Sequence, residues 1–253
     1  MINGKSITVV LPAFNAAKTL EATYREIPFD MVDHVILVDD LSSDDTIHVA
    51  EKLGIRHIIR HQENLGYGGN QKSCYRKALE LDSDIIVMLH PDYQYTPRLI
   101  PSMCYLIANE VYEVVLGSRI LGKSAIRGGM PFYKYMANRI LTFIQNVFLN
   151  QKLSEYHTGF RAFSRRVLTS INLQENSDDF VFDNQMLAQI IFRGFEIAEI
   201  TCPTRYFEEA SSINLKRSMI YGLGVLKVSL QYVLQKSKLF KFRLFDQQDD
   251  MNP

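Results

Sequence analysis

The sequence predicts an α/β fold: a Rossmann-like, doubly wound and mostly parallel sheet with helices on both faces and a helical extension at the C-terminus. Two observations support this prediction. Short apolar runs rich in β-branched residues alternate with amphipathic helical patterns through the first 120 residues, as in parallel sheets that are covered on both faces. Polar or glycine-rich clusters follow several of these runs, and in sheets of this class ligands bind at the carboxyl ends of the strands.

Each element is predicted from its local pattern. Apolar runs bounded by turn residues predict strands at 6–12, 34–40, 55–61, 84–90, 113–119 and 195–207. Apolar residues at helical spacing predict helices at 16–26, 44–53, 69–81, 97–109, 132–150 and 180–193. We expect residues 1–210 to form one domain and residues 211–253 to form a basic amphipathic helical extension.

Composition and charge exclude several classes of protein. Lys+Arg and Asp+Glu each number 28, so no nucleic-acid partner is predicted. Cys74, Cys104 and Cys202 form no CxxC pair, which indicates reduced thiols of a cytoplasmic protein rather than a disulfide framework or a zinc site. The N-terminal stretch MINGKSITVVLPAF predicts a first strand instead of a signal peptide. No window reaches the ~18 apolar residues of a membrane span, so we expect any membrane contact to be peripheral, at the inner face.

Two adjacent acids, Asp39 and Asp40, lie at the tip of the second predicted strand, in the stretch VDDLSSDDT. Ser43 and Asp44 are ordinary helix-capping residues, but the two acids precede the turn. Adjacent carboxylates repel one another unless a cation or a hydrogen-bond donor shares them. A nucleoside base or ribose, or a metal ion, would supply that partner.

The stretch ENLGYGGNQK, residues 63–72, carries glycines and asparagines directly before a predicted helix. Glycine lets a ligand approach the backbone, and a helix N-terminus with Lys72 in its first turn favours anionic groups. The stretch is neither a Walker loop nor GxGxxG, and an ordinary strand-to-helix loop is the alternative interpretation.

The most informative stretch is HPDYQYTP, which follows the apolar run IIVML. Asp92 and Gln94 lie two residues apart after a strand, so their side-chain oxygens could bind one cation. Oxygen ligands suit Mg²⁺ or Mn²⁺. The alternative is a strand-end turn in which Asp92 is a hydrogen-bonded turn residue.

Taken in order, five motifs resemble glycosyltransferase family 2 over residues 6 to 230: VVLPAFNAAKTL, VILVDDLSSDDT, NLGYGGNQK, the acidic motif after IIVML, and TGFRAF. The likeness is greatest to the branch of dolichyl-phosphate mannose synthase and the polyprenyl-phosphate glycosyltransferases. The resemblance implies a GT-A fold and transfer of a sugar from a nucleotide-diphosphate donor. It also implies a divalent metal, Mn²⁺ or Mg²⁺, and inversion at the anomeric carbon.

The resemblance further implies roles for individual residues. The nucleotide site would comprise Pro12, Ala13 and Phe14 beside the base, Asp39 and Asp40 at base and ribose, and Asn64, Gly66 and Lys72 of the glycine-rich stretch. The family's metal motif, commonly Asp-Ala-Asp followed by Leu-Gln, falls on residues 90–94, so Asp92 and Gln94 would bind the metal. His90 stands where the family usually has Asp. A neutral imidazole can ligate Mn²⁺, but His90 could instead hydrogen-bond ribose or phosphate, or simply close the turn.

The last two motifs suggest the catalytic groups. In TGFRAF, Gly159 would allow a close backbone approach, and Arg161 would hold a phosphate with its guanidinium fork; a surface salt bridge is the plainer alternative. On this interpretation Arg161→Lys loses activity with little change in stability. The segment DDFVFDNQM resembles the family's acceptor side, with Gln185 in place of a frequent Glu. Since Gln185 cannot take a proton, Asp183 or Asp179 would be the base, and a phosphate acceptor would need little base.

The predicted function is that of an inverting glycosyltransferase of hexosyltransferase type. It would move a sugar from a nucleotide-diphosphate sugar to a polyprenyl-phosphate or saccharide acceptor. One alternative is a nucleotide-sugar-binding regulatory protein with impaired catalysis, in which His90 and Gln185 mark the loss. A second is a nucleotidyltransferase on a similar sheet, although the stretch LPAFNAAKT after the first strand lacks the glycine-rich phosphate loop that it would favour.

The helix predicted at 132–150 and the C-terminal extension are more apolar or more basic than the proposed catalysis requires. The former is apolar at 133, 136, 140, 144 and 147 and carries further aromatic residues on its other faces. The extension has an apolar helical stripe, and residues 211–245 contain Lys or Arg but no acid. The stripe consists of Met219, Leu223, Leu226, Leu230 and Val233. These helices would dock on the domain, form a homo-oligomer through 132–150 or 211–245, or lie on an anionic membrane.

Overall fold

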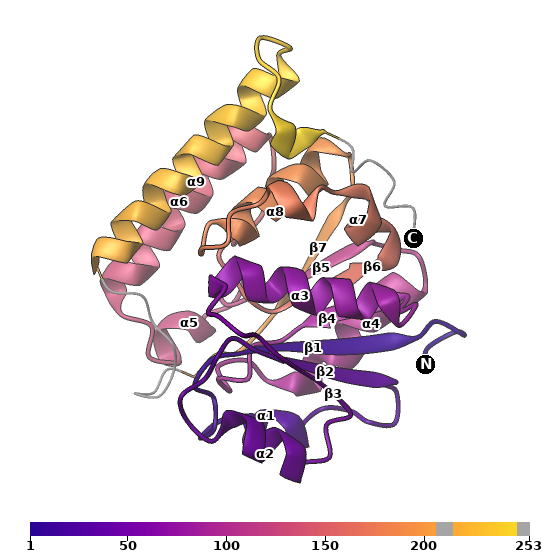
Figure 1. Ribbon diagram of the computed structural model, residues 1–253. Coiled ribbons are helices and arrows are strands. Elements are labelled where there is room, and N and C mark those ends of the chain that lie inside the picture. The colour runs from indigo at the N-terminus through magenta and orange to yellow at the C-terminus, as the bar shows by residue number, and fades with distance from the viewer. Residues whose placement is uncertain (206–214, 247–253) are drawn as a thin grey trace.

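The computed structural model describes residues 1–205 and 215–246. Its centre is a seven-stranded sheet in the order β3-β2-β1-β4-β6-β5-β7 (Figure 1). The strands are β1 (Ile7–Ala13), β2 (His34–Asp39), β3 (His57–Arg60), β4 (Ile85–Met88), β5 (Val114–Ser118), β6 (Arg161–Ser164) and β7 (Ile197–Thr201). Every residue of β1, β4 and β5 is buried, because helices cover both faces of a parallel sheet.

The pairing of the strands confirms the mostly parallel sheet. The strands β1 to β4 pair in parallel, as do β5 and β7. The short strand β6 lies between β4 and β5 and is antiparallel to both. All six predicted strands are present, and a seventh, the short strand β6, begins at Arg161 of the TGFRAF motif.

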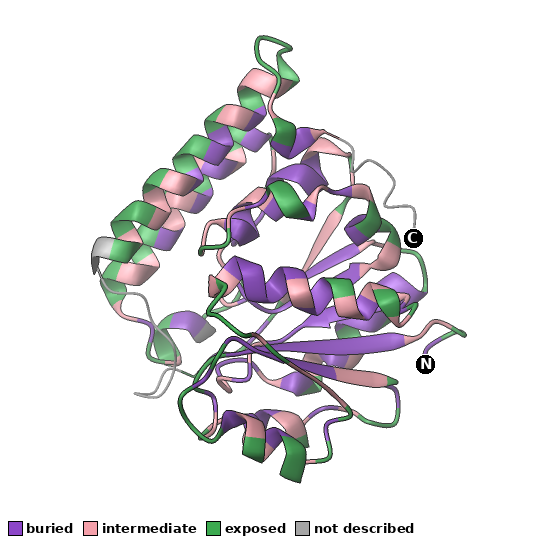
Figure 2. Ribbon diagram, in the orientation of Figure 1, coloured by how far each residue is buried: buried purple, intermediate pink, exposed green. Residues whose placement is uncertain are grey.

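The helices cover both faces of the sheet, as predicted (Figure 1). One core lies between the sheet and α3, α7 and α8, and a second lies between the sheet and α1, α2 and α4. Figure 2 shows the buried residues concentrated in the sheet and on the inner sides of these helices. The bounds are α1 (Leu20–Arg25), α2 (Thr46–Lys52), α3 (Gly66–Glu80), α4 (Ile100–Ala108) after the 3₁₀ turn η1 (Pro97–Leu99), α5 (Ser124–Arg127), α6 (Phe132–Leu149), α7 (Arg165–Ser170), η2 (Leu173–Glu175), α8 (Phe182–Phe192), α9 (Leu215–Lys236) and η3 (Arg243–Phe245).

Helices α6 and α9 lie side by side and project beyond the sheet (Figure 1). An ordinary surface helix buries its apolar face, but α6 buries mainly polar residues. Its buried residues are Asn138, Thr142, Gln145 and Leu149, whereas its predicted docking face points outward, with Tyr133, Met136, Ile140 and Val147 exposed. The expectation that this face docks on the domain is therefore wrong, because the inward face makes polar contacts instead.

Helix α9 likewise turns its predicted stripe away from the domain. It packs on α6 and α8 through other residues, among them the buried Val225, Val228 and Tyr232, while Met219 and Leu223 are about two-thirds exposed. Docking of the stripe on the domain is therefore also wrong. The predicted boundary at residue 210 falls outside the described residues, so the division of the chain at that point stays a prediction. Within residues 1–205 and 215–246, no helix combines the length and apolarity that crossing a bilayer requires.

Candidate active site

A cleft of about 810 Å³ opens at the carboxyl ends of β1, β2 and β4; we call it the donor cleft. The parallel register places Ala13 beside Asp39, so the first two strand tips adjoin as predicted. Most of the predicted nucleotide residues line the cleft together with Asp92 and Asp179, namely Pro12, Ala13, Phe14, Asp40, Asn64, Gly66 and His90. Phe14 lines the cleft and is 56% exposed, so its ring is accessible for stacking.

The two adjacent acids have different surroundings. Asp40 accepts hydrogen bonds from the backbone amides of Leu65 (2.8 Å) and Gly66 (2.9 Å) and faces His61 Nδ1 at 2.8 Å. These amides at the start of α3 stabilise the negative charge of Asp40. A bound ligand is therefore not required to stabilise it. Asp39 is fully buried; one oxygen accepts from the Ser42 amide (3.0 Å), and Oδ1 has no hydrogen-bond partner among the described residues.

The glycine-rich stretch forms the first turns of α3 and not the loop before it. Gly66 has a φ of +81°, which favours glycine. A side chain on Gly68 would meet the Ser177 carbonyl at 2.3 Å, and the Gly68 amide donates to the Asp178 carbonyl at 2.7 Å. The close backbone approach predicted for these glycines therefore exists, but residues 177–178 of the same chain make it.

Lys72 does not take the predicted position in the first helical turn. It lies in the second turn of α3, nearly buried, and its Nζ donates to Asn176 O (2.6 Å), Asp178 Oδ1 (2.7 Å) and Gln174 O (3.3 Å). Its three donors are thus used on the segment before α8. The prediction that Lys72 binds the nucleotide is corrected: it clamps residues 174–178, of which Ser177 and Asp178 line the donor cleft.

Asp92 is presented by the turn after β4. Its Oδ1 accepts from the Gln94 amide (3.0 Å), and Tyr93 between them has a φ of 56°. Asp92 is therefore a hydrogen-bonded turn residue, as the alternative interpretation had it, and it also lines the donor cleft. Across the described residues no group of three or more His, Cys, Asp or Glu forms a metal site. The donor set nevertheless fits Mg²⁺ or Mn²⁺, which proteins often hold through one carboxylate together with substrate phosphates.

The imidazole of His90 is held between Tyr67 and Gly159. The rings of His90 and Tyr67 are stacked at 5.3 Å and 19°, and a side chain on Gly159 would meet His90 Cδ2 at 2.5 Å. The close approach predicted for Gly159 is therefore made by His90. Burial lowers the pKa of His90, although Asp92 and Asp183 oppose the shift, so the ring is neutral near pH 7.

The hydrogen bonds around Tyr67 fix the tautomer of His90. Tyr67 Oη donates its only proton to Asp183 Oδ2 at 2.7 Å and lies 3.1 Å from His90 Nε2. In the contact with Tyr67, the nitrogen Nε2 must therefore be the donor. A neutral His90 then keeps a lone pair only on Nδ1, the one atom through which it could ligate a metal.

Asp183 and Arg161 form a buried ion pair beside these rings. Arg161 is fully buried; its Nη1 lies 3.3 Å from Asp183 Oδ1, and its other donors bond the Thr158 (2.7 Å) and Tyr156 (3.0 Å) carbonyls. Both the phosphate-binding role and the surface salt bridge predicted for Arg161 are therefore wrong, because its donors point into the protein. Gln71 Nε2 also donates to Asp183 at 3.2 Å.

The other candidate base directly follows the clamped segment 174–178. Asp179 is exposed, lines the donor cleft and accepts from the Phe180 amide at 2.8 Å. Gln185, which replaces the family's usual Glu, accepts from the Ser177 amide at 2.7 Å and so supports the same segment. The base role of either Asp183 or Asp179 stays a prediction.

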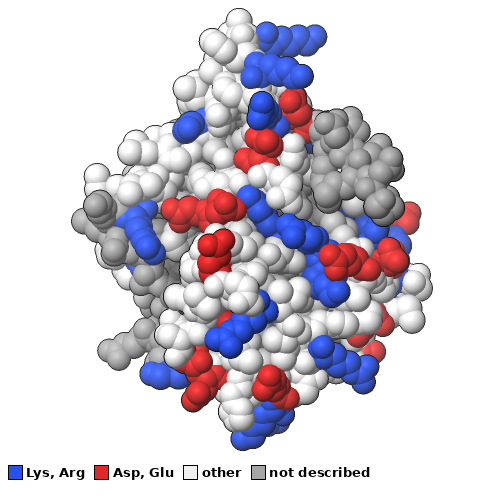
Figure 3. Space-filling view, in the orientation of Figure 1, with Lys and Arg blue, Asp and Glu red and all other residues white. Residues whose placement is uncertain are grey.

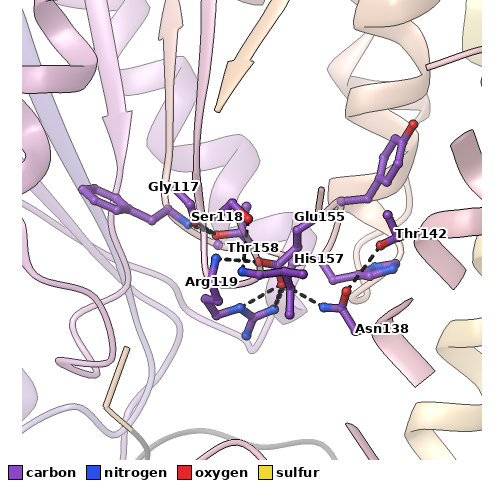
Figure 4. A network of polar contacts seen from close by, with 12 residues as sticks. Gly117, Ser118, Arg119, Asn138, Thr142, Glu155, His157 and Thr158 are labelled. Carbon is purple, nitrogen blue, oxygen red and sulfur yellow. Dashed lines mark hydrogen bonds and ion pairs between the residues drawn. The ribbon is translucent and has the colours of Figure 1, made fainter. Parts of the chain in front are cut away.

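A second cavity of about 420 Å³ adjoins the donor cleft; we call it the acceptor pocket. Gln94 and Asp183 line it, as do residues of α6 and α9 such as Tyr133, Leu141 and Met219. Gln94 thus lies in the acceptor pocket, whereas Asp92 borders both cavities. A polar network beneath this pocket joins residues of α6 and the segment before β6 (Figure 4).

Glu155 is the centre of that network. It is fully buried, pairs with Arg119 and accepts from Asn138 Nδ2 at 2.8 Å (Figure 4). Burial alone would raise the pKa of Glu155, but Arg119 and Asn138 hold it below its usual value. His157 Nδ1 lies 2.6 Å from Tyr221 Oη, and burial lowers the pKa of His157 to about 4. The buried polar face of α6 therefore serves to support the acceptor pocket.

Several residues that line the site were not predicted from the sequence. Tyr67 and Phe180 line both cavities, and His157 and Tyr221 line the acceptor pocket. Tyr67 lies inside a motif already selected for its glycines, and Phe180 lies in DDFVFDNQM. Aromatic residues at such positions resemble ordinary core residues, so a single sequence contains no signal that separates them.

The mostly parallel sheet, with a two-part cleft at its carboxyl edge, has the GT-A fold. A family model described as Glycosyl transferase family 2 matches residues 8–171, and the chain belongs to this family. Among solved structures, glucosyl-3-phosphoglycerate synthase from Mycobacterium tuberculosis in complex with UDP is similar, with a TM-score of 0.70 and 21% identity over 91% of this chain and 80% of the other. Other structures of that synthase contain UDP with Mn²⁺ or Mg²⁺.

Curated relatives confirm the predicted branch of the family. The UDP-N-acetylglucosamine–dolichyl-phosphate N-acetylglucosaminyltransferase of Methanococcus voltae is 26% identical over 244 residues, covering 88% of this chain and 97% of the relative. The polyprenol monophosphomannose synthase of Mycolicibacterium smegmatis is 20% identical over 199 residues, covering 76% of this chain and 74% of the relative. Membership of this family excludes the nucleotidyltransferase alternative.

Proposed function

We propose that this protein transfers a sugar from a nucleoside-diphosphate sugar to a polyprenyl phosphate, with inversion at the anomeric carbon. One observation carries the choice of acceptor: the acceptor pocket opens onto the outward apolar faces of α6 and α9. Tyr133 and Met219 line the pocket and are 62% and 64% exposed. A lipid chain could therefore lie on these helices while its phosphate enters the pocket, whereas a saccharide would gain little from this surface.

The donor nucleotide is assigned to the donor cleft. Phe14, which lines the cleft, would stack on the base. Asp39 Oδ1 is unpaired, but Asp39 is fully buried and is not among the lining residues, so it would accept a hydrogen bond from the base only after the tip of β2 opened. Asp92 would hold a Mn²⁺ or Mg²⁺ ion at the diphosphate, and the ion supplies positive charge to the leaving group. Gln94 lines the acceptor pocket together with Asp92 and would be the second ligand of the same ion.

The proposed chemistry is a single displacement. An oxygen of the acceptor phosphate attacks the anomeric carbon from the face opposite the diphosphate, the new carbon–oxygen bond forms as the old one breaks, and the nucleoside diphosphate leaves. The attacking oxygen is already ionised near neutral pH, so no base need remove a proton. Asp183 then serves mainly to hold Tyr67 and the Arg161 ion pair in place.

The test of the transfer is an assay with uridine and guanosine diphosphate sugars, Mn²⁺, and a short polyprenyl phosphate in detergent. We expect nucleoside diphosphate release that depends on the lipid phosphate, and a glycolipid product with the inverted anomeric configuration. Release that is equally fast with a soluble saccharide contradicts the choice of acceptor. Binding of a nucleotide sugar without turnover with any acceptor supports the regulatory alternative.

The outward faces of α6 and α9 are assigned to an anionic membrane. Figure 3 shows a largely uncharged surface over these helices and Lys and Arg side chains at the tip beyond α9. Exposed apolar residues there include Phe143 (69%), Leu223 (68%) and Leu239 (69%). The exposed basic residues on and beyond α9 include Lys227, Lys236, Lys238, Lys241 and Arg243, and each could add ~1 kcal/mol near anionic lipids.

Flotation with liposomes tests the membrane surface. We expect the wild-type protein to float with phosphatidylglycerol vesicles at low salt, and Phe143→Glu together with Leu223→Glu to abolish flotation. Tyr105→Glu, at an exposed position on α4, is the matched control and should float normally. A wild-type protein that stays at the bottom of the gradient contradicts the membrane assignment. If that protein is also a dimer in sedimentation experiments, the outward faces of α6 and α9 would instead be assigned to contact with a second copy.

A further inference from the structure

The donor cleft and the acceptor pocket meet at a boundary made of few residues. Both cavities are lined by Tyr67, His90, Asp92 and Phe180. In the proposed reaction the anomeric carbon must be reached from the acceptor pocket while it is still bonded to the diphosphate in the donor cleft. The transferred sugar must therefore lie against these residues.

Two of the boundary residues are aromatic and in contact with each other. The rings of Tyr67 and Phe180 are 4.9 Å apart and inclined by 36°, and His90 is stacked on Tyr67. Tyr67 cannot turn freely, since its hydroxyl bonds both Asp183 and His90. The three rings thus form a continuous aromatic row between the end of β4 and the start of α8.

Phe180 is held in this row by the clamped segment. The Asp178 carbonyl accepts from the Gly68 amide, and the Asp178 carboxylate accepts from Lys72, both at 2.7 Å. The Phe180 amide is fixed by Asp179. The Phe180 ring is only half-buried although it is apolar, so it presents hydrocarbon surface to both cavities from a rigid support.

We propose that Phe180 and Tyr67 form the platform on which the transferred sugar packs, and that Phe180 contributes to the choice of sugar. This inference rests on the proposed function. The C–H groups on one face of a pyranose carry partial positive charge and complement the negative face of an aromatic ring. Phe180 would contact the sugar but not the nucleotide, since the base site proposed at Phe14 lies at the tip of β1.

Calorimetry with nucleotides that carry or lack a sugar distinguishes a contact of Phe180 with the sugar from a contact with the nucleotide. The ligands are UDP and GDP, each alone and as its glucose, N-acetylglucosamine and mannose conjugates, with Mn²⁺ present throughout. We expect Phe180→Ala to weaken binding of the preferred nucleotide sugar by about 10-fold, the size of one aromatic contact, while the free nucleoside diphosphate binds as in the wild type. Phe180→Tyr keeps the ring and should restore binding, and relative affinities for the sugars should change in Phe180→Ala.

Phe14→Ala is the matched control, because it should weaken binding of the nucleoside diphosphate and binding of its sugar conjugates equally. Equal weakening of both ligands by Phe180→Ala overturns the platform and places Phe180 at the nucleotide. Unchanged binding of every ligand by Phe180→Ala overturns the platform while the proposed function stands. A wild-type protein that binds none of these nucleotides overturns the proposed function and the platform with it.

Discussion

Replacing Asp92 with Asn is expected to lower the rate of sugar transfer by about 10²-fold or more, equivalent to several kcal/mol of activation free energy. Asp92 is the acid that borders both the donor cleft and the acceptor pocket. In the proposed reaction negative charge accumulates on the leaving diphosphate at this point. An amide would keep the shape of the turn and lose the charge that holds the metal.

The measurement is the initial rate of nucleoside diphosphate release as a function of Mn²⁺ concentration, together with nucleotide binding at each concentration. Asp30→Asn removes an exposed acid outside both cavities and should match the wild type. The free energy of unfolding of the Asp92 variant should stay near that of the wild type, because Asp92 is only half-buried. Undiminished Mn²⁺ dependence of nucleotide binding in Asp92→Asn contradicts the metal assignment.

Replacing Arg161 is expected to destabilise the protein, in contrast to the expectation from the sequence that only activity would suffer. Arg161→Met leaves the Asp183 carboxylate buried without its ion-pair partner, which typically costs 3–5 kcal/mol. Arg161→Lys keeps the charge but cannot reach the carbonyls of Tyr156, Thr158 and Asp183 that the guanidinium bonds now. We expect Arg161→Lys to lower the free energy of unfolding by about 2–3 kcal/mol, since buried carbonyls lose their hydrogen-bond donors.

Urea unfolding measures these differences as shifts of the midpoint at constant slope. Arg166→Met is the matched control. The Arg166 side chain is 75% exposed and pairs with Glu113, so its loss should lower the free energy of unfolding by less than about 1 kcal/mol. An Arg161→Lys variant that unfolds like the wild type but has lost activity would contradict the structural role and restore the phosphate-binding prediction.

The fold and the location of the donor cleft could be predicted because they depend on local patterns. The apolar runs of β1, β2 and β4 and the helices between them predict a mostly parallel sheet and the edge at which the cleft lies. Asp39 ends β2, Asp40 follows it, and Asp92 lies in the turn after β4, so the parallel sheet brings them to one edge. The resemblance to the family also depends on these ordered motifs and was confirmed.

The roles of Lys72 and Arg161, and which faces of α6 and α9 are buried, could not be predicted from local patterns. Lys72 and Arg161 each appear in a motif next to the site, yet Lys72 bonds a segment more than 100 residues away and Arg161 is buried behind Asp183. A hydrogen-bond donor takes whichever acceptor the folded chain places within reach, and that acceptor can come from a distant segment.

By itself the sequence determined the class of fold, the ordered motifs and the edge of the sheet where the cleft lies, because periodicity and strand-end position are properties of neighbouring residues. Only the tertiary structure decided that α6 turns Asn138 and Gln145 inward, that Gly159 makes room for His90, and that Tyr67 and Phe180 divide the two cavities. An amphipathic pattern identifies two faces of a helix but not which face is covered. That choice depends on the partners that the rest of the chain supplies, here buried Glu155 and Asn184 for the polar side of α6.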